Sequence, residues 1–527
     1  MSAAAGVMDA ARPLDPSYPH RWIIAITVTL ASILEILDTS IVNVAIPHMM
    51  GSLGATLDQI TWVSTGYIVA NVIVLPVTGW MSAYFGRRRY FAGSIALFTI
   101  ASILCGNSHT LTELVIFRVV QGLGGGALLS TAQATLYEVF PPEEYGSAMA
   151  IFGLGVMVGP TLGPTFGGWI TDTWSWPWIF YINVPFGALA LVLSLAYVRD
   201  SRFARRVESV DWTGLALLAI GIGMLQTMLE RGERLDWFAS REIVTYATVS
   251  AASLASFVWH ELHTPHPVID LRILANRQFG TGCVVGAILG LCLYATVFVL
   301  PVYLQQSLGF TANQTGMVIL PGALASAVTM AAMGRTLGRV DGRPIAAFGA
   351  ALFAVAMWQW SRFTLQSGFS DFFWPLIVRG VSLGLVFIPL NNLAVAELPM
   401  SQIGAATGLY NLTRQLGGSI GIALSASAIA RFTAEGRAVL ASHVPANDPA
   451  VLARLETLAQ GLRSHGASTA TARAGALGAL AHEVQRQASM LAFEKVFLLF
   501  GLAFLLAMPL ILSLRWRPGG RAGAEAH

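Results

Sequence analysis

Residues 22–49, WIIAITVTLASILEILDTSIVNVAIPHM, form an apolar stretch longer than the ~20 residues that an α-helix needs to cross a bilayer. Two carboxylates interrupt the stretch, Glu35 and Asp38. A charged side chain at the centre of a membrane span costs at least about 2.5 kcal/mol, so it usually faces the interior of a helix bundle. Because a spacing of three residues puts both acids on one helix face, they can share a cavity. The stretch indicates a membrane protein that uses an ion gradient.

The composition of the whole chain agrees with a membrane protein. Of its 527 residues 55% are hydrophobic and 11% are charged, against about 25% charged residues in soluble domains. A net charge of +3 is too small to indicate a nucleic-acid partner. The three cysteines lie in apolar runs without metal-site or disulfide spacing, and we expect no metal site.

Fourteen apolar stretches are near the length of a membrane span. They cover residues 22–49, 61–84, 90–106, 111–136, 148–170, 180–198, 212–229, 243–259, 279–302, 315–333, 345–362, 373–395, 405–430 and 495–514. Arginines gather in every second connection, which places both chain ends in the cytoplasm. The segment before the first span has no secretory signal.

One of these connections has a degenerate second copy. The sequence GWMSAYFGRRR, residues 79–89, joins the second and third spans, and GRTLGRVDGR, residues 334–343, joins the tenth and eleventh. The two connections are equivalent if the chain has six spans, an inserted pair and six further spans. A duplicated bundle with a binding site between its halves is the usual plan of a transporter.

The predicted fold is therefore all-α, with two six-helix bundles and two inserted helices. The expected parts are a cytoplasmic tail (1–20), an N-terminal bundle (21–198), an inserted pair (199–262), a cytoplasmic linker (263–276), a C-terminal bundle (277–515) with a periplasmic loop (431–492), and a second tail (516–527).

Several motifs resemble those of one known family. Residues 79–89 resemble motif A of the major facilitator superfamily, RVVQG at 118–122 resembles motif B, and GVMVGPTLGP at 155–164 resembles motif C of its antiporters. WIFYINVP at 178–185 and NLTRQLGGS at 411–419 are similar to segments of its fourteen-span drug:proton antiporters, and the whole arrangement resembles the EmrB type of multidrug efflux pump. One departure is Ala83, where motif A often has an acid.

The resemblance implies a proton-coupled antiporter that exports lipophilic compounds from a bacterial inner membrane. It implies the proton gradient as energy source and no other cofactor. It also implies a periplasmic membrane-fusion adaptor and, through the adaptor, an outer-membrane channel. We expect the periplasmic loop to be either a disordered spacer or the surface that docks the adaptor.

The expected proton-coupling residues are Asp38, Glu35 and Arg118. At ~1.5 Å per residue, Asp38 lies about 16 Å from the outer end of the first span, and Arg118 lies about 10 Å from the outer end of the fourth span. The long arginine side chain can bridge this difference in depth and reach the carboxylate. Pairing favours the charged carboxylate and removal from water favours the neutral one, so the balance can change with conformation. The alternative is a permanent ion pair that only holds the helices together.

Other residues are expected to bind substrate or to control access. Arg414 falls about 15 Å into the thirteenth span, and the ninth to fourteenth spans contain no acid in their interiors. It either binds an anionic substrate, acts as a mobile counter-ion for Glu35 and Asp38, or has a purely structural role. The expected substrate-binding residues are Arg414, Asn43, Gln121, Tyr67, Tyr294, Asn391 and Tyr410. The expected gating residues are Gly79, Gly86, Arg87, Arg88, Gly155, Gly159, Pro160 and Gly163, some of which could serve helix packing alone.

Two other functions remain open at this stage. One is the transport of a single defined metabolite. The other is a membrane-embedded enzyme, which would need paired catalytic groups that the spans do not display. The single lysine, Lys495, is not part of a P-loop, which excludes a self-contained ATP-driven pump of that type.

Overall fold

The computed structural model describes residues 20–141, 144–202, 210–265, 267–336, 340–445 and 447–516, and these residues form helices and connections without a strand. The N-terminal half contains α1 (Arg21–Leu53), α2 (Leu57–Ile60), α3 (Trp62–Phe85), α4 (Arg87–Gly106), α5 (Leu111–Val139), α6 (Tyr145–Thr173), α7 (Trp178–Tyr181) and α8 (Asn183–Tyr197). The inserted pair is α9 (Trp212–Arg231) and α10 (Arg241–His263). The C-terminal half contains α11 (Arg277–Val302), α12 (Ala312–Thr336), α13 (Gly342–Trp360), α14 (Phe369–Val395), α15 (Met400–Ser442), α16 (Pro449–Ser464) and α17 (Thr469–Ser513). The predicted all-α class is confirmed.

Twelve helices in the described part of the chain are long and apolar enough to cross a membrane. Two of the fourteen expected spans, at 148–170 and 345–362, are helical as α6 and α13 but are not among these twelve. The protein is a multi-pass membrane protein, and the number fourteen stays a prediction.

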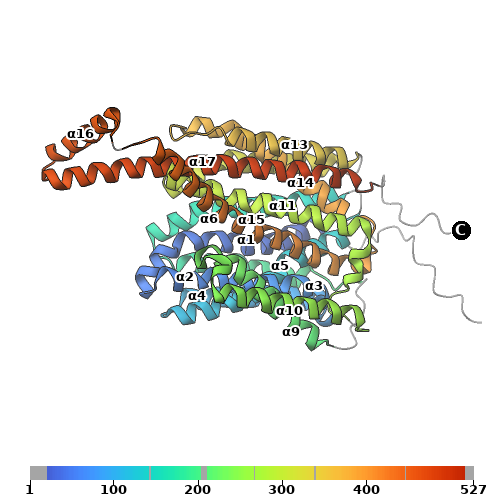
Figure 1. The fold of residues 1–527 in the computed structure, drawn as a ribbon. Coiled ribbons are helices and arrows are strands. Elements are labelled where there is room, and N and C mark those ends of the chain that lie inside the picture. The colour runs from blue at the N-terminus through green and yellow to red at the C-terminus, as the bar shows by residue number, and fades with distance from the viewer. Residues whose placement is uncertain are drawn as a thin grey trace, which may run out of the picture.

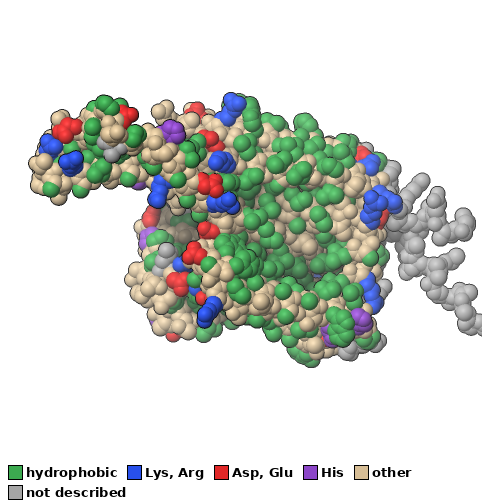
Figure 2. Space-filling model, in the orientation of Figure 1, with side chains coloured by type: hydrophobic (Ala, Val, Ile, Leu, Met, Phe, Trp, Pro, Cys, Tyr) green, Lys and Arg blue, Asp and Glu red, His purple; other side chains and the backbone are tan. Residues whose placement is uncertain are grey.

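The two halves lie one above the other in Figure 1, with the C-terminal half in yellow to red above the blue to cyan N-terminal half. A broad hydrophobic band covers the middle of the body, and charged side chains gather toward its two ends (Figure 2). We call one end the arginine end, after Arg87, Arg88, Arg277, Arg343 and Arg515. The opposite end carries α16, and we call it the projection end.

Glycines bring the halves into backbone contact at the arginine end. A Cβ atom built on Gly79 of α3 would lie 2.6 Å from the backbone nitrogen of Ala405 in α15, and one on Gly146 of α6 would lie 2.5 Å from the carbonyl oxygen of Gly334 in α12. No side chain larger than hydrogen fits these distances without a shift of backbone. The halves are therefore closed against each other at this end.

Neutral hydrogen bonds reinforce that closure. Gln133 Nε2 donates to Asn391 Oδ1 at 3.0 Å, Asn411 Nδ2 donates to Gln133 Oε1 at 2.9 Å, and the Tyr137 hydroxyl donates to Asn392 Oδ1 at 3.1 Å. We call these five residues the amide seam. Within the described ranges, no ion pair joins the N-terminal half to the C-terminal half.

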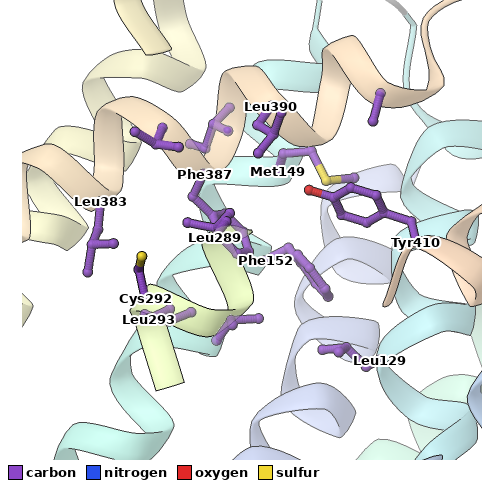
Figure 3. Close-up of a cluster of buried hydrophobic side chains, with 14 of the residues drawn as sticks. Leu129, Met149, Phe152, Leu289, Cys292, Leu293, Leu383, Phe387, Leu390 and Tyr410 are labelled. Atoms are coloured by element: carbon purple, nitrogen blue, oxygen red, sulfur yellow. The ribbon is translucent and has the colours of Figure 1, made fainter. Parts of the chain in front are cut away.

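Apolar side chains from both halves form a plug beside the seam. Figure 3 shows Leu129, Met149 and Phe152 of α5 and α6 facing Leu289 of α11 and Phe387 of α14. All five side chains are buried. Since water is excluded from this contact, the plug adds a second barrier between the middle of the protein and the arginine end.

The inserted pair touches both halves. Arg231 at the end of α9 pairs with Asp58 of α2 at 3.2 Å. On the other side, Gln226 Nε2 donates to the Ser419 hydroxyl and Trp237 Nε1 to the Ser427 hydroxyl, both at 2.8 Å. The pair therefore covers the side of the body where α3 and α15 meet.

The expected periplasmic loop at 431–492 is helical. The helix α15 continues for 43 residues and α17 begins at Thr469, so both extend beyond the body, and α16 folds back on α17 (Figure 1). Ala459, Ala472 and Ala476 are buried where α16 and α17 pack. The alanine-rich sequence explains the difference, because alanine has the highest helix propensity and each helix has a neighbour to pack on.

Candidate functional site

Asp38 lies at the centre of a buried polar network. Its side chain is inaccessible to solvent, and its Oδ2 is 2.5 Å from Nη1 of Arg118 on α5. Gln121 Nε2 and Asn183 Nδ2 both donate to Asp38 Oδ1 at 2.9 Å. The predicted pairing of Asp38 with Arg118 is confirmed, and the carboxylate has a donor on each oxygen.

The arginine of this pair is held in place from several sides. Arg118 Nε donates to the carbonyl oxygen of Val63 at 3.1 Å, and the guanidinium carbon lies 4.1 Å from the Tyr67 ring centroid. Gln121 Oε1 accepts from Arg118 at 2.6 Å, while Gln121 Nε2 also donates to Ser102 at 2.7 Å. Because neighbouring hydrogen bonds strengthen one another in a low dielectric, a change in the charge of Asp38 must rearrange several groups together.

Glu35 has a less complete environment, one turn before Asp38. Its Oε1 accepts from Asn71 Nδ2 at 2.9 Å, and its backbone carbonyl accepts from the Tyr67 hydroxyl at 3.4 Å. Its buried Oε2 has no hydrogen-bond partner among the described residues. A half-satisfied carboxylate accommodates an added proton or a cationic group more readily than a fully bonded one.

Arg414 on α15 is also only partly satisfied. The side chain is buried, its guanidinium carbon lies 5.4 Å from the Phe387 ring centroid, and Nε and Nη1 have no partner in the described part of the chain. Among the described residues Arg414 forms no ion pair, and Glu35 of the other half is an opposite charge at longer range.

The cavity between the halves is built from five helices. The space that a water-sized sphere can occupy in it is about 40 Å³, within about 520 Å³ of non-atom space that includes open solvent. Its walls are Ile36 (α1), Val156 (α6), Leu293, Tyr294 and Val297 (α11), Ile319, Gly322, Ala323 and Ser326 (α12), and Arg379, Gly380 and Leu383 (α14). The lining is mostly apolar with a few polar groups, which is typical of a small-molecule site.

Of the seven expected substrate-binding residues, Tyr294 lines this cavity. Gln121 and Tyr67 belong to the Asp38 network, and Asn391 belongs to the amide seam. Tyr410 lies near Met149 in the plug (Figure 3). Asn43 is exposed and accepts from the Ser64 hydroxyl at 3.1 Å. Polar groups on apolar helices reach partners across helix interfaces, so a position in a span does not by itself predict a cavity wall.

Sequence reasoning missed several residues of these networks. They are Asn183, Asn71, Gln133 and Ser102, neutral side chains whose sequence context gives no sign of a buried partner. Arg379 is an arginine inside the apolar stretch 373–395, the same kind of signal that identified Arg414.

The arginines of motif A bond to the N-terminal half and to the connection that follows it. Arg87 pairs with Glu138 at 2.6 Å in a buried contact, and the backbone nitrogen of Arg88 donates to Asp200 Oδ1 at 2.9 Å. Gly86 has a φ of +85°, and a Cβ atom there would meet the same Asp200 oxygen at 2.8 Å. Glu138 and Asp200 thus provide the carboxylates that the alanine at position 83 cannot.

The glycine stripe of motif C packs against α1. A Cβ atom on Gly155 would meet Ile33 Cγ1 at 2.8 Å, one on Gly159 would meet Ile36 Cγ2 at 2.7 Å, and one on Gly163 would overlap the Ser40 hydroxyl. The predicted close approach of helices is confirmed, and a gating role stays a prediction. The side chain of Pro160 lies outside the described residues.

We expect Gly79→Val to open the arginine end, because its side chain would collide with the backbone of Ala405. The reporter is a cysteine at Ser130, which lies between the halves and accepts from Asn411, in a background without the native cysteines. Labelling by a membrane-impermeant maleimide in inside-out vesicles should rise several-fold. Gly93→Val is the matched control, since a Cβ atom at Gly93 meets nothing within 4 Å. Equal labelling in both variants would contradict the close contact.

Comparisons with known proteins agree with this geometry. Residues 28–422 match the model of the Major Facilitator Superfamily. The chain is 33% identical over 511 residues to "Multidrug export protein EmrB" of Escherichia coli (strain K12), covering 96% of this chain and 98% of that protein. It is 32% identical over 509 residues to "Fatty acid resistance protein FarB" of Neisseria gonorrhoeae, with coverage of 96% and 98%.

A solved structure supports the fold. The human organic anion transporter MFSD10 superposes with a TM-score of 0.57 at 15% identity, and the match covers 92% of this chain and 100% of that chain. At this identity the likeness concerns the helix arrangement alone.

Proposed function

Because this chain belongs to the major facilitator superfamily, among its EmrB-type multidrug efflux transporters, we propose that it is a proton-coupled antiporter that exports lipophilic toxic compounds. We place it in a bacterial inner membrane with the arginine end and both chain ends in the cytoplasm, in keeping with the positive-inside rule.

One observation carries the proposal. A fully buried carboxylate in a membrane span, Asp38, is held by an arginine from another helix, and Ile36 of the same span lines a cavity between two halves that are closed at one end. Intramembrane acids of this kind are expensive to retain and usually serve transport. A site between two halves that can rock is the requirement for alternating access.

The conformation described here would be the outward-facing one, since the arginine end is closed. A proton entering from the projection end would reach Glu35, whose Oε2 is unpartnered, or would compete with Arg118 for Asp38. Protonation of Asp38 would release Arg118 and loosen the hydrogen bonds of Gln121 and Asn183. Substrate would leave outward, and the proton would exit to the cytoplasm after the halves rock.

We further propose that α16 and the adjoining ends of α15 and α17 dock a periplasmic adaptor, which would lead to an outer-membrane channel. Leu452, Leu462 and Leu477 are exposed on this projection. Its extension beyond the hydrophobic band supports a contact outside the membrane (Figure 2).

Reconstitution into proteoliposomes tests the function. An imposed pH gradient, acidic on the side that faces the projection end, should drive accumulation or efflux of several unrelated dyes and drugs. Transport of only one compound from a broad panel would favour the alternative of a single defined metabolite. Absence of any dependence on the pH gradient would refute proton coupling.

We expect Arg414→Gln to reduce transport of acidic and neutral compounds alike, because the buried guanidinium is an opposite charge for Glu35 at a distance longer than an ion pair. The second substitution Glu35→Gln should restore part of the activity, since it removes the charge on which Arg414 acts. Arg431→Gln is the control, an exposed arginine on the same helix that pairs with Glu435. The measurement is gradient-driven uptake of one acidic and one neutral dye. A loss confined to the acidic dye would instead assign Arg414 to substrate binding.

A further inference from the structure

Direct hydrogen bonds between the two halves lie toward the arginine end. Within the described ranges, each of them has a partner between Ser130 and Ser147, in the last part of α5 or the start of α6. Helices α3 and α15 also meet there, where a Cβ atom on Gly408 would lie 2.6 Å from the carbonyl oxygen of Leu75. Toward the projection end, the described polar contacts between the halves run through the inserted pair. We call residues 231–240, which join α9 to α10 at that end, the strap.

The strap is attached to the N-terminal half by two arginines. Arg231 Nη2 lies 3.2 Å from Asp58 Oδ1 of α2, and its guanidinium carbon lies 5.0 Å from the ring centroid of Trp62, the first residue of α3. Arg234 Nη1 donates to the Thr61 hydroxyl at 2.9 Å. Both arginines therefore hold the strap to the turn that precedes α3.

A single serine attaches the strap to the C-terminal half. Trp237 Nε1 donates to the Ser427 hydroxyl of α15 at 2.8 Å and to Glu233 Oε2 at 3.0 Å. The Ser427 hydroxyl donates to the same Glu233 oxygen. Indole, hydroxyl and carboxylate thus form a closed triangle, and the strap connects the start of α3 to the part of α15 near the projection end.

The backbone of the strap is strained at the residue that makes this bond. Trp237 has a φ of +49° and Asp236 a φ of +53°, in the left-handed region that bulky side chains rarely adopt. The indole packs on Gly232, where a Cβ atom would lie 2.5 Å from the ring. Such a conformation persists only where the surrounding structure holds it, and it is concentrated at switch regions and functional sites. The strain therefore indicates a segment that its end contacts keep in place.

We propose that the strap is a latch that stabilises the conformation closed at the arginine end, because it fixes the distance between α3 and α15 at the projection end. When the halves separate at the arginine end, they have to approach each other at the projection end. That movement changes the distance between Asp58 and Ser427, so one attachment has to release, and the strain at Trp237 favours release from Ser427. This assignment deepens the proposed export function and rests on it for the outward-facing identity of the latched state.

The test measures how often the arginine end opens. Full-length protein in inside-out vesicles, without substrate or pH gradient, carries the reporter Ser130→Cys in the background without native cysteines, and a membrane-impermeant maleimide labels it. Ser427→Ala removes the attachment to α15 and leaves the bond between Trp237 and Glu233 in place. Labelling should rise roughly three- to tenfold, the population shift expected for the loss of a hydrogen bond. Gly79→Val shows that the reporter responds.

A matched control and a double variant distinguish a latch from local packing. The Ser425 hydroxyl donates to the carbonyl oxygen of Gly421 within α15, so Ser425→Ala should change labelling less than twofold. Asp58→Ala removes the ion pairs at the other attachment and should raise labelling as Ser427→Ala does. Because a latch holds only while both attachments are made, the double variant should label less than twofold faster than the faster single variant. Independent effects would instead multiply.

Three outcomes would overturn the proposal. The first is unchanged labelling in Ser427→Ala while Gly79→Val responds, and the second is an equal rise in Ser425→Ala. The third is a double variant in which the two single effects multiply. Because labelling needs neither substrate nor gradient, a protein that shows the expected pattern but does not transport would refute the export function and leave the latch standing.

Discussion

Asp38→Asn should abolish transport driven by a pH gradient, reducing uptake in proteoliposomes to the level of protein-free liposomes. The amide keeps an oxygen that can accept from Gln121 and Asn183, so the network retains its shape. It cannot take up or release a proton. Arg118 loses its counter-ion, and breaking a buried pair costs about 3–5 kcal/mol, although its bonds to Val63 and Gln121 remain. Thermal unfolding of the purified variant must therefore accompany the transport assay.

A neutral member of the same network provides the control. Ser102→Ala removes the acceptor of one Gln121 hydrogen bond without changing charge, at a cost of about 1 kcal/mol in stability, and should retain gradient-driven transport. Glu35→Gln should lower transport less than Asp38→Asn, or only for some compounds. If a folded Asp38→Asn protein still accumulates substrate against its gradient, another residue carries the proton. If both acid variants lose transport completely, both acids belong to one proton relay.

Removal of the projection should eliminate resistance in whole cells and leave transport in proteoliposomes largely intact. In cells, an adaptor has to receive the compound at the periplasmic side, whereas liposomes need no adaptor. The contact between α15 and α17 determines which residues can be deleted. A Cβ atom on Gly436 would lie 3.5 Å from Cα of Ala488, and α15 and α17 run in opposite directions. Ser442 and His482 are each six residues beyond this contact, on the side away from the body.

The variant therefore deletes residues 443–482 and joins Ser442 to Glu483 by a short Gly/Ser linker. It keeps the buried Ala488 and the hydrogen bond from Arg486 to the carbonyl oxygen of Ser307 at 3.1 Å. Membrane abundance is measured first, and both assays use the same variant. Loss of transport in proteoliposomes would mean that the projection stabilises the cavity, and retained resistance in cells would mean that an adaptor binds elsewhere or is not needed.

The fold could be predicted from the sequence because long apolar runs and regular arginine placement are local patterns. The contact between Asp38 and Arg118 was also predictable, since both depths follow from the rise of a helix and few other charges are available. The helix α16 is indicated by the helical spacing of Leu452, Leu455 and Leu462. The extension of α15 and α17 on either side of it does not follow from the sequence, because an alanine-rich polar segment is compatible with both a spacer and a helix until its packing partner is known.

The substrate-binding residues were the least predictable part. A polar residue in a span signals that it has a partner, but the partner can be a neighbouring helix, the opposite half or a ligand. Asn391 bonds across the halves to Gln133, 258 residues away in the chain, and no sequence spacing encodes that distance. Arg379 was detectable by the same rule as Arg414. Only the structure distinguishes the first, at a cavity wall, from the second, which lies outside that wall and forms no ion pair among the described residues.

The amide seam has a consequence for the electrical work of transport. Its five side chains are uncharged, so opening and closing the arginine end moves none of their charge through the membrane voltage. The voltage then acts on the proton, on the cargo and on the charged groups buried in the spans, Glu35, Asp38, Arg118, Arg379 and Arg414. Moving one elementary charge across 100 mV is worth about 2.3 kcal/mol. An anion leaving a negatively charged interior while a proton enters moves two charges in the favourable direction, a neutral cargo moves one, and a monovalent cation moves none.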